Sequence, residues 1–320
     1  MLAVAVTNAS SAWHLSTLTL AAGTTLDVAP SGLWGRYCDI PGFNAATISN
    51  AFTSVAAATA FFAGYAPTLT ANSHEAGDGF DFGDSTKGTI AFPGVFRPAR
   101  GNYAVIWRGK IRIASPGPYT FTTTSDDNSM LFIDGAPVVD NNGSHGYISK
   151  SGALPLTAGL HDIVILYAQG GGGYGIRADI LFPGAATAVP IPNAILVAAP
   201  EDVPAYTLTV DHIRVIGASG AGTLSLSGGA LRFGALSVDL GTRLAVTGSS
   251  AALSTPVLPV AISAPVPYGV TVVGDFSQSG GLNLSGAALQ LSGSDGILRY
   301  NATTRHLQIG RSSGTLLLLR

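Results

Sequence analysis

Two adjacent carboxylates stand out in this 320-residue chain, because only 11% of its residues are charged. Asp126 and Asp127 lie in the segment Thr-Ser-Asp-Asp-Asn-Ser at residues 124–129, whose composition is typical of a turn. Two carboxylates on one tight turn repel each other unless a cation neutralises them. A second feature is the glycine run at residues 170–173, where backbone without side chains can approach an ion or a sugar closely.

Dense motifs surround both segments. They are Trp-Arg-Gly at 107–109, Gly-Pro-Tyr-Thr-Phe at 117–121, Phe-Ile-Asp-Gly at 132–135, Val-Val-Asp-Asn at 138–141, Gly-Ser-His-Gly at 143–146 and Leu-Thr-Ala-Gly-Leu-His at 156–161. In order and spacing the motifs resemble the PA14 domain, a carbohydrate-binding domain first described in the protective antigen of a bacterial toxin. Residues 32–37 match its usual opening, so the resemblance covers about residues 32–183. It implies an antiparallel β-sandwich.

The resemblance also implies a calcium site. Glycan-binding members of this family hold Ca²⁺ with two adjacent aspartates joined by a cis peptide, and Asp126 and Asp127 are the counterparts here. Related lectins take further ligands from a second loop, which implies the amide oxygen of Gln169 and the backbone carbonyl of Gly171. Ca²⁺ accepts six to eight oxygen ligands in a flexible shell, which leaves room for two sugar hydroxyls.

The same loops are expected to contact the glycan. Aromatic faces suit the apolar side of a pyranose ring, so Tyr174 and Tyr147 are candidates to stack on a sugar, with a place in the core or at the rim as the alternative. The full expected set is Asp126, Asp127, Gly172, Gly173, Tyr174 and Tyr147. Fungal flocculins of this family carry an asparagine in the second loop, and its absence here leaves the sugar specificity undefined.

Other polar residues are assigned smaller roles. We expect His145 to form hydrogen bonds within its own turn. Asp78, Asp81 and Asp84 belong either to a second cation site or to a solvated loop, and their spacing does not fit the helix-loop-helix calcium loop. Cys38 is the single cysteine, so no intrachain disulfide can form, and its apolar neighbours predict a buried position.

The elements that must position these residues are strands. Short runs of Val, Ile, Leu, Thr, Tyr and Phe recur between Gly, Ser, Asn and Pro, which predicts an all-β chain; residues 51–63 are the one helix-compatible segment. The Pro- and Ala-rich residues 184–207 favour a linker or a crossover along the sandwich. Residues 208–320 form a second Gly- and Ser-rich β module, either a small sandwich or a β-solenoid-like stack, and no fixed period can be counted.

The predicted domains are therefore residues 31–183 as the sandwich, 184–207 as the linker and 208–320 as the second module. Residues 1–30 form a hairpin-sized piece that needs a partner sheet. The alternation of residues 17–23 is similar to that of residues 223–229, so we expect the N-terminal piece to pair with the C-terminal module and the sandwich to be an insertion.

Several function classes are disfavoured. A formal net charge of -2 without basic clusters argues against nucleic acid, and no apolar run is long enough to span a bilayer. Glu75 and Glu201 are the only glutamates, and neither a nucleophile elbow, a phosphate-binding loop nor a zinc signature occurs, so we do not expect an enzyme.

The sequence thus predicts a calcium-dependent carbohydrate-binding module, of lectin or adhesin type, whose partners are glycans or glycoproteins. It is expected in an extracellular, cell-surface or virion-surface protein. The alternative is a structural subunit of a surface filament, sheath or virion, decorated by the sandwich. Weakly charged strand edges could add a neighbouring subunit, so a homopolymer through β-edges belongs to that alternative.

Overall fold

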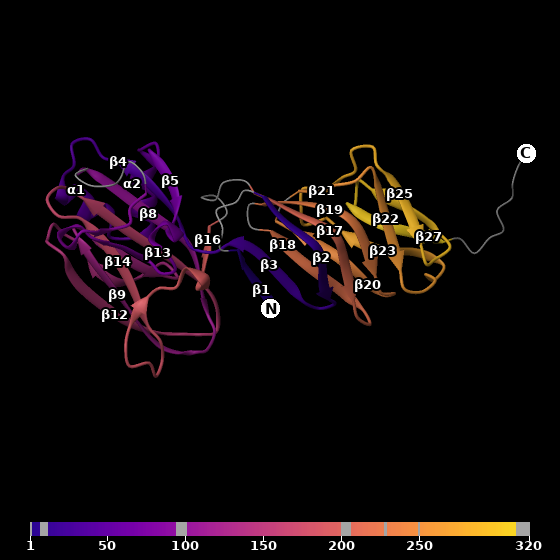
Figure 1. The fold of residues 1–320 in the computed structure, drawn as a ribbon, viewed down its shortest axis with the longest axis horizontal. Coiled ribbons are helices and arrows are strands. Elements are labelled where there is room, and N and C mark those ends of the chain that lie inside the picture. Colours follow the sequence, from indigo (N-terminus) through magenta and orange to yellow (C-terminus); the bar gives the residue numbers. More distant parts are fainter. Residues whose placement is uncertain are drawn as a thin grey trace, which may run out of the picture. The chain divides into compact units, whose positions relative to one another are not determined.

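A computed structural model describes residues 2–6, 12–93, 101–199, 206–226, 229–248 and 250–311. The chain forms two compact units, one of Pro30–Val203 and one that combines Met1–Ala29 with Pro204–Arg320. Strands dominate both units, which confirms the all-β prediction (Figure 1). Among the helices of the described ranges, none has the length and apolar character needed to cross a membrane.

The unit Pro30–Val203, called the sandwich below, contains two sheets. The β8 sheet has the strand order β11-β10-β13-β8-β4-β5, with β16 paired to β8, and the β9 sheet has the order β12-β9-β14-β6-β7, with β15 paired to β14. The strands are β4 (Trp34–Asp39), β5 (Leu69–Asn72), β6 (Asp81–Asp84), β7 (Thr89–Ile90), β8 (Tyr103–Ile113), β9 (Gly117–Asp126), β10 (Ser129–Ile133), β11 (Ala136–Asn141), β12 (Ile148–Leu156), β13 (Gly159–Gln169), β14 (Gly175–Leu181), β15 (Val189–Pro190) and β16 (Leu196–Ala198).

Alternation along the strands builds the core between the two sheets. On β9, Tyr119 and Phe121 are buried while Thr120 and Thr122 face outward, the two-residue period of a half-buried strand. Trp107 of β8 lies across from them, fully buried and in edge contact with Phe80 at 5.0 Å between ring centroids. This core is large and aromatic, and it fixes the loops at the end of the sheets where Asp126 lies.

Two helices cover the outer face of the β8 sheet, α1 (Ala45–Ala51) and α2 (Val55–Ala63). Phe52 and Phe62 pack against Ile106 of β8 and Leu166 of β13, so this sheet is buried on both faces. The sequence predicted one short surface helix at residues 51–63; the structure has two helices whose apolar faces belong to a core. Cys38 is fully buried in the same cluster, as predicted.

Residues 189–198 belong to the sandwich, which corrects the linker predicted at 184–207 and fits the alternative of a crossover along the sandwich. β15 pairs with β14 and β16 pairs with β8, while Ile191 and Leu196 are fully buried. Proline lacks an N–H and is confined to sheet edges, so a Pro-rich segment can run along the two sheets as short edge strands. Residues 200–205 of the predicted linker lie outside the described residues.

The second unit, called the solenoid below, also has two sheets, ordered β1-β3-β18-β20-β23-β27-β26 and β2-β17-β19-β21-β24, with β22 paired to β19 and β25. Its strands are β1 (Leu2–Val6), β2 (Ala12–Ala21), β3 (Thr25–Pro30), β17 (Tyr206–Ile216), β18 (Gly220–Leu226), β19 (Gly229–Val238), β20 (Thr242–Thr247), β21 (Ala251–Leu253), β22 (Val257–Ile262), β23 (Gly269–Asp275), β24 (Leu282–Asn283), β25 (Ala288–Ser292), β26 (Ile297–Asn301) and β27 (His306–Arg311). Consecutive turns of the chain add one strand to each sheet.

The ladders between successive coils are parallel, as in a β-solenoid: β17 pairs with β19, β18 with β20 and β22 with β25. β2 pairs with β17 and β3 with β18, so the N-terminal segment forms the preceding coil. The direct partner of β2 is thus β17 and not residues 223–229, to which the sequence comparison pointed. An antiparallel hairpin of β26 and β27 follows β23.

The register gives the sandwich a defined position in the solenoid. Tyr206 pairs with Gly229, and Gly220 of the neighbouring sheet pairs with Thr242. In both sheets, paired residues of successive coils are therefore separated by nearly equal lengths of chain. Ala12 pairs with Thr207, and most of the chain between them is the sandwich. The residues between Ala12 and Thr207 that do not belong to the sandwich have nearly the length of one ordinary coil. The sandwich therefore interrupts the chain between two ordinary coils, at the end of β3.

Candidate metal and ligand site

The two aspartates lie where β9 ends. Asp126 is the last residue of β9 and pairs with Gly175 of β14, and Asp127 begins the turn into β10. The peptide bond between them is cis, as the resemblance implied. Both residues are nearly buried, with 7% and 5% of their surface exposed. The sequence-predicted pair is therefore one compact acidic feature at an end of the sandwich.

Backbone and hydroxyl donors hold the carboxylate of Asp127. Its Oδ1 accepts hydrogen bonds from the Ser144 hydroxyl at 2.9 Å and the His145 N–H at 3.0 Å, and its Oδ2 accepts one from the Gly170 N–H at 3.0 Å. One carboxylate thus ties the turn of residues 143–146 to the glycine loop of residues 170–173. Bonds to an ionised acceptor are stronger than neutral ones, so Asp127 organises both loops.

The carboxylate of Asp126 is in the opposite situation. It accepts no hydrogen bond from the described residues, although it is nearly buried. Burial and, after it, the neighbouring charge of Asp127 raise the pKa of Asp126 to about 6, and Asp84 adds to this while His145 opposes it. Near neutral pH this group is therefore ionised without a hydrogen-bonded partner among the described residues, which is the electrostatic condition that a cation would relieve.

The side-chain amide of Gln169 connects the aspartate turn to the glycine loop. Its Oε1 accepts the N–H of Asp127 at 3.1 Å, and its Nε2 donates to the Gly173 carbonyl at 2.7 Å. With 1% exposure the amide is enclosed, so its oxygen serves the turn. The amide thus joins the aspartate turn to the glycine loop, and the ligand role that the resemblance implied for Gln169 stays a prediction.

Tyr167 is a second brace that sequence reasoning missed. Its hydroxyl donates to the Asp126 carbonyl at 2.6 Å and accepts the Gly175 N–H at 3.1 Å. The ring is fully buried in the core. A tyrosine in an apolar strand normally indicates core, and only its position two residues before Gln169 hinted at a contact with the site.

The glycine loop combines open and crowded positions. Gly171 and Gly172 are exposed, and a Cβ on either would meet nothing within 4 Å. At Gly173 a Cβ would lie 2.7 Å from Oδ2 of Asp126 and 3.3 Å from Cγ2 of Thr86. The absence of a side chain at Gly173 therefore keeps the space beside the Asp126 carboxylate open.

The two predicted aromatic contacts separate. Tyr174 is 8% exposed and packs on Phe92 at 6.1 Å between ring centroids, which corrects the expectation that it stacks on a sugar, because its ring faces the core. Tyr147 is half-buried at the rim, with Nζ of Lys87 5.8 Å from the centre of its ring. Of these two tyrosines, Tyr147 is the one that keeps an aromatic surface near the loops.

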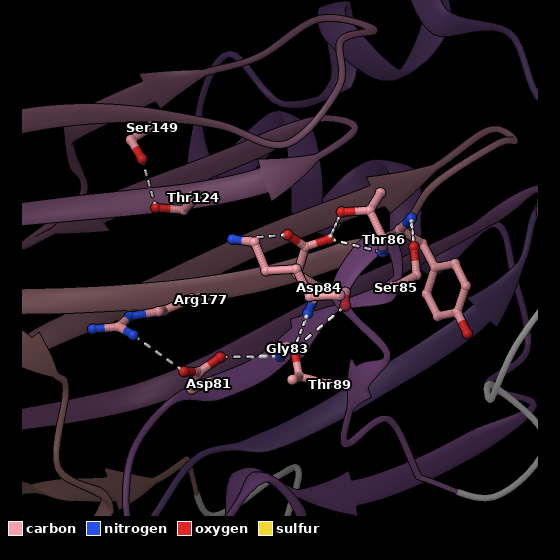
Figure 2. A network of polar contacts seen from close by, with 11 residues as sticks. Asp81, Gly83, Asp84, Ser85, Thr86, Thr89, Thr124, Ser149 and Arg177 are labelled. Carbon is pink, nitrogen blue, oxygen red and sulfur yellow. Dashed lines mark hydrogen bonds and ion pairs between the residues drawn. The ribbon is translucent and has the colours of Figure 1, made fainter.

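Asp84, for which the sequence allowed either a second cation site or a solvated loop, is the last residue of β6. It is nearly buried, and its Oδ1 accepts hydrogen bonds from the N–H of Thr86 at 2.9 Å and from the Thr86 hydroxyl at 2.6 Å (Figure 2). Nζ of Lys87 lies 3.4 Å from the Oδ2 of Asp84. Asp84 and Asp126 both pair with Gly175 of β14, from its two sides, so Asp84 lies near the aspartate pair. The three aspartates of that segment do not form one cation site, because Asp78 is exposed and Asp81 pairs with Arg177 at 3.3 Å.

His145 behaves as predicted, since both ring nitrogens lie 2.9 Å from backbone carbonyls, those of Gly146 and Asn141. Within the described part of the chain, no group of three or more His, Cys, Asp or Glu residues is arranged to hold a metal ion. A cation at the aspartate pair would therefore draw its remaining ligands from backbone oxygens, water or a bound molecule.

Comparison with known proteins supports the fold of this region. The PA14 domain family matches residues 85–180, which confirms the predicted PA14 domain. No curated protein matches the chain.

Among solved structures, the chain is similar to a PA14 sugar-binding domain from an RTX adhesin, at 20% identity over 52% of this chain and 98% of that one, with a TM-score of 0.41. It is similar to the epithelial adhesin 6 A domain of Candida glabrata, solved in complex with Galb1-3GlcNAc, at 10% identity over 53% of this chain and 89% of that one, with a TM-score of 0.39. An anti-sigma factor domain-containing protein is 22% identical over 52% of this chain but only 48% of that protein, with a TM-score of 0.38.

Proposed function

We propose that the sandwich is a calcium-dependent carbohydrate-binding module of lectin or adhesin type and that it binds without catalysis. The observation that carries the proposal is the carboxylate of Asp126, nearly buried, beside a second carboxylate and without a hydrogen-bond donor among the described residues. A bound cation would offset the cost of ionising such a group, because isolated buried charges are unfavourable.

The donor set fits calcium. Asp126 and Asp127 supply carboxylate oxygens, and the exposed backbone of Gly171 and Gly172 supplies carbonyl oxygens from the second loop. Hard oxygen ligands of this kind, in number below the six to eight that Ca²⁺ takes, leave positions for water or for sugar hydroxyls. Bound calcium would supply a fixed positive charge that orients hydroxyl groups. Gln169, Tyr167 and the donors to Asp127 hold the two loops together.

The environment suits a hydroxyl-rich ligand at a surface. The chain has few charges and a net charge of -2, so the loops attract neither polyanions nor polycations strongly. The PA14 match places this module in a family with carbohydrate-binding members, and we propose the outer surface of a cell or virion as its location. In this proposal the solenoid is the scaffold that presents the module.

Calcium titration by calorimetry tests the metal site. We expect Asp127→Asn to weaken calcium affinity by more than about tenfold, because one of two charged ligands is lost. Asp140→Asn is the matched control, since Asp140 is exposed and its acceptor role toward the Asn142 N–H survives in asparagine. Unchanged calcium affinity in Asp127→Asn, with a native circular dichroism spectrum, contradicts the assignment.

Glycan binding is tested separately on an array, with calcium and with chelator. The proposal expects retention on at least one glycan class that disappears in chelator and in Asp127→Asn. Calcium binding without any glycan retention would instead favour the structural alternative, in which the ion only joins the two loops.

A further inference from the structure

A row of polar side chains crosses the outer face of the β9 sheet. The registers align Ser149 of β12 with Thr124 of β9, Thr124 with Arg177 of β14, and Arg177 with Asp81 of β6. Residues in register on adjacent strands point to the same face, so these four side chains form one line (Figure 2). With strands about 4.8 Å apart, the line is about 14 Å long.

The members of this polar row are held in place by one another. Thr124 and Ser149 share a hydrogen bond of 2.8 Å between their hydroxyls. Nε of Arg177 donates to both oxygens of Asp179 at 2.7 and 2.9 Å, and Nη1 donates to Asp81 at 3.3 Å. The Arg177 side chain is nevertheless 36% exposed, so guanidinium hydrogens remain for a ligand. Such fixed donors and acceptors bind at a small entropic cost.

A second hydroxyl pair extends the polar row into a strip. The hydroxyl oxygens of Thr122 of β9 and Ser151 of β12 lie 2.7 Å apart. On the two strands, these residues are two positions from Thr124 and Ser149 and face the same side. The strip then ends, because the next outward residue of β9, Thr120, has Ala153 and Leu181 as its register partners. The hydroxyl pairs are thus confined to the half of the sheet nearer to Asp126.

Tyr147 joins this strip to the calcium loops. It immediately precedes β12 and follows the turn of residues 143–146, where Ser144 and His145 donate hydrogen bonds to Asp127. Lys87, which pairs with Asp84 at 3.4 Å, approaches the ring of Tyr147. Tyr147 thus links, along the chain, the turn that bonds Asp127 to the strand that carries Ser149 and Ser151.

We propose that the strip and Tyr147 form an extended subsite that continues from the calcium loops along the β9 sheet and takes the inner units of a neutral, linear oligosaccharide. The module would then recognise a chain of sugars and not only a terminal one. This inference rests on the proposed function, of which it names the ligand class.

The balance of charge selects the occupant. Arg177 is paired with two carboxylates, those of Asp81 and Asp179, and Lys87 is paired with Asp84. Every charged group of the strip therefore has an opposite partner, and the single negative charge in excess disfavours an anionic polymer and attracts a cationic one only weakly. Hydroxyls, a guanidinium and one aromatic ring are the groups with which proteins meet uncharged polyols, because they supply both directional hydrogen bonds and an apolar face. A neutral glycan matches this combination.

The test uses the full chain and a panel of immobilised neutral linear glycans of glucose, galactose, mannose and N-acetylglucosamine, each as mono-, di-, tetra- and hexasaccharide. The variant is the double substitution Thr124→Val with Ser149→Ala, which removes both members of an exposed hydroxyl pair and leaves neither unpaired. Thr120→Val is the control, because it makes the same change on the same face of β9 outside the strip.

For the glycan class that binds, tetra- and hexasaccharides should bind the natural chain at least about tenfold more tightly than the monosaccharide. The double variant should lose at least about fivefold of that gain, since each hydroxyl hydrogen bond contributes modestly. Its monosaccharide binding and its thermal shift with calcium should stay unchanged, and Thr120→Val should behave as the natural chain.

Affinity that is independent of chain length, or a double variant that matches the natural chain, overturns the extended subsite and leaves the calcium site standing. Length-dependent binding that survives chelator and fails in the double variant supports the strip and overturns the calcium-dependent function. Absence of retention for every glycan, with and without calcium, overturns both.

Discussion

Replacing Asp126 by asparagine should stabilise the sandwich when no cation is present and abolish its response to calcium. Asparagine has the same shape as aspartate but carries no charge. The substitution removes no side-chain hydrogen bond within the described residues, because none reaches this carboxylate there. The change in stability therefore measures the electrostatic cost of keeping Asp126 ionised.

The size of that cost follows from the pKa. Burial, with Asp127 second, raises the pKa of Asp126 from 3.8 to about 6, and each pKa unit corresponds to about 1.4 kcal/mol. The upper limit is thus about 3 kcal/mol at neutral pH, and screening by water at the edge of the site reduces it to about 1 to 2 kcal/mol. For a unit of this size, that corresponds to a rise in Tm of roughly 2–8 °C.

The sign of the pH dependence is fixed. Because the folded pKa lies above the unfolded value, the penalty is absent at low pH, appears as pH rises from about 4 to about 6, and stays constant above that. Scanning calorimetry of the full chain in chelator, at pH 4 and pH 7.5, should show the Asn variant ahead only at the higher pH. Calcium should then raise the Tm of the natural chain and leave that of the variant unchanged.

Asp140→Asn is the control for charge alone, since Asp140 is exposed on the same sandwich. The reasoning is refuted if Asp126→Asn is no more stable than the natural chain in chelator at pH 7.5, or if it retains the full calcium shift. A gain that is equally large at pH 4 would also contradict it, because the folded carboxyl is protonated there and most of the penalty is absent.

Three further outcomes are expected. Gly173→Ala should weaken calcium binding by about tenfold or more, because its Cβ would lie 2.7 Å from Oδ2 of Asp126, whereas Gly171→Ala, with nothing within 4 Å, should not; calorimetry compares the two. The hydrogen bond with Asp134 raises the pKa of His161, so the protonated histidine stabilises the fold fully below about pH 6.5, and this contribution is lost as pH rises through the folded pKa. The free energies of unfolding in urea of the natural chain and of His161→Gln should therefore differ more at pH 5.5 than at pH 9. Replacing Pro30–Val203 by a short turn should leave a folded solenoid by circular dichroism, because the register of β2 and β17 then spans close to one ordinary coil; an unfolded product would contradict this coil assignment.

The parts of the site that the sequence revealed are those with a local signature. Two adjacent aspartates and a run of glycines are visible in the chain as unusual neighbours, and the surrounding motifs placed them in a β-sandwich. The braces were not visible. Tyr167 and Ser144 contact the aspartate turn from distant positions in the sequence. Their residue types alone predict a core tyrosine and a turn serine, so nothing in the sequence marks them as part of a site.

Tyr174 shows the opposite case, in which a local pattern predicts an exposed ring that the fold buries. A tyrosine beside a glycine run suggests an exposed platform, yet the residue after Gly173 is already entering β14, where side chains alternate between core and surface. Burial against Phe92 was decided by that alternation and by a partner from a much earlier part of the chain. A local pattern cannot indicate which face of a strand looks inward until the sheet is known.

The solenoid was hidden for a different reason. The step from Gly220 to its partner Thr242 has the length of an ordinary coil, whereas the next step in the same sheet, from Leu244 to Gly274, is clearly longer. Parallel ladders require only that successive strands align, and connecting loops can absorb extra residues at little cost, because the entropy of closing a loop grows slowly with its length. A fixed period is therefore not needed for a regular stack. The same tolerance, extended to the whole of Pro30–Val203, allows an entire sandwich to occupy one loop between the coils of β3 and β17.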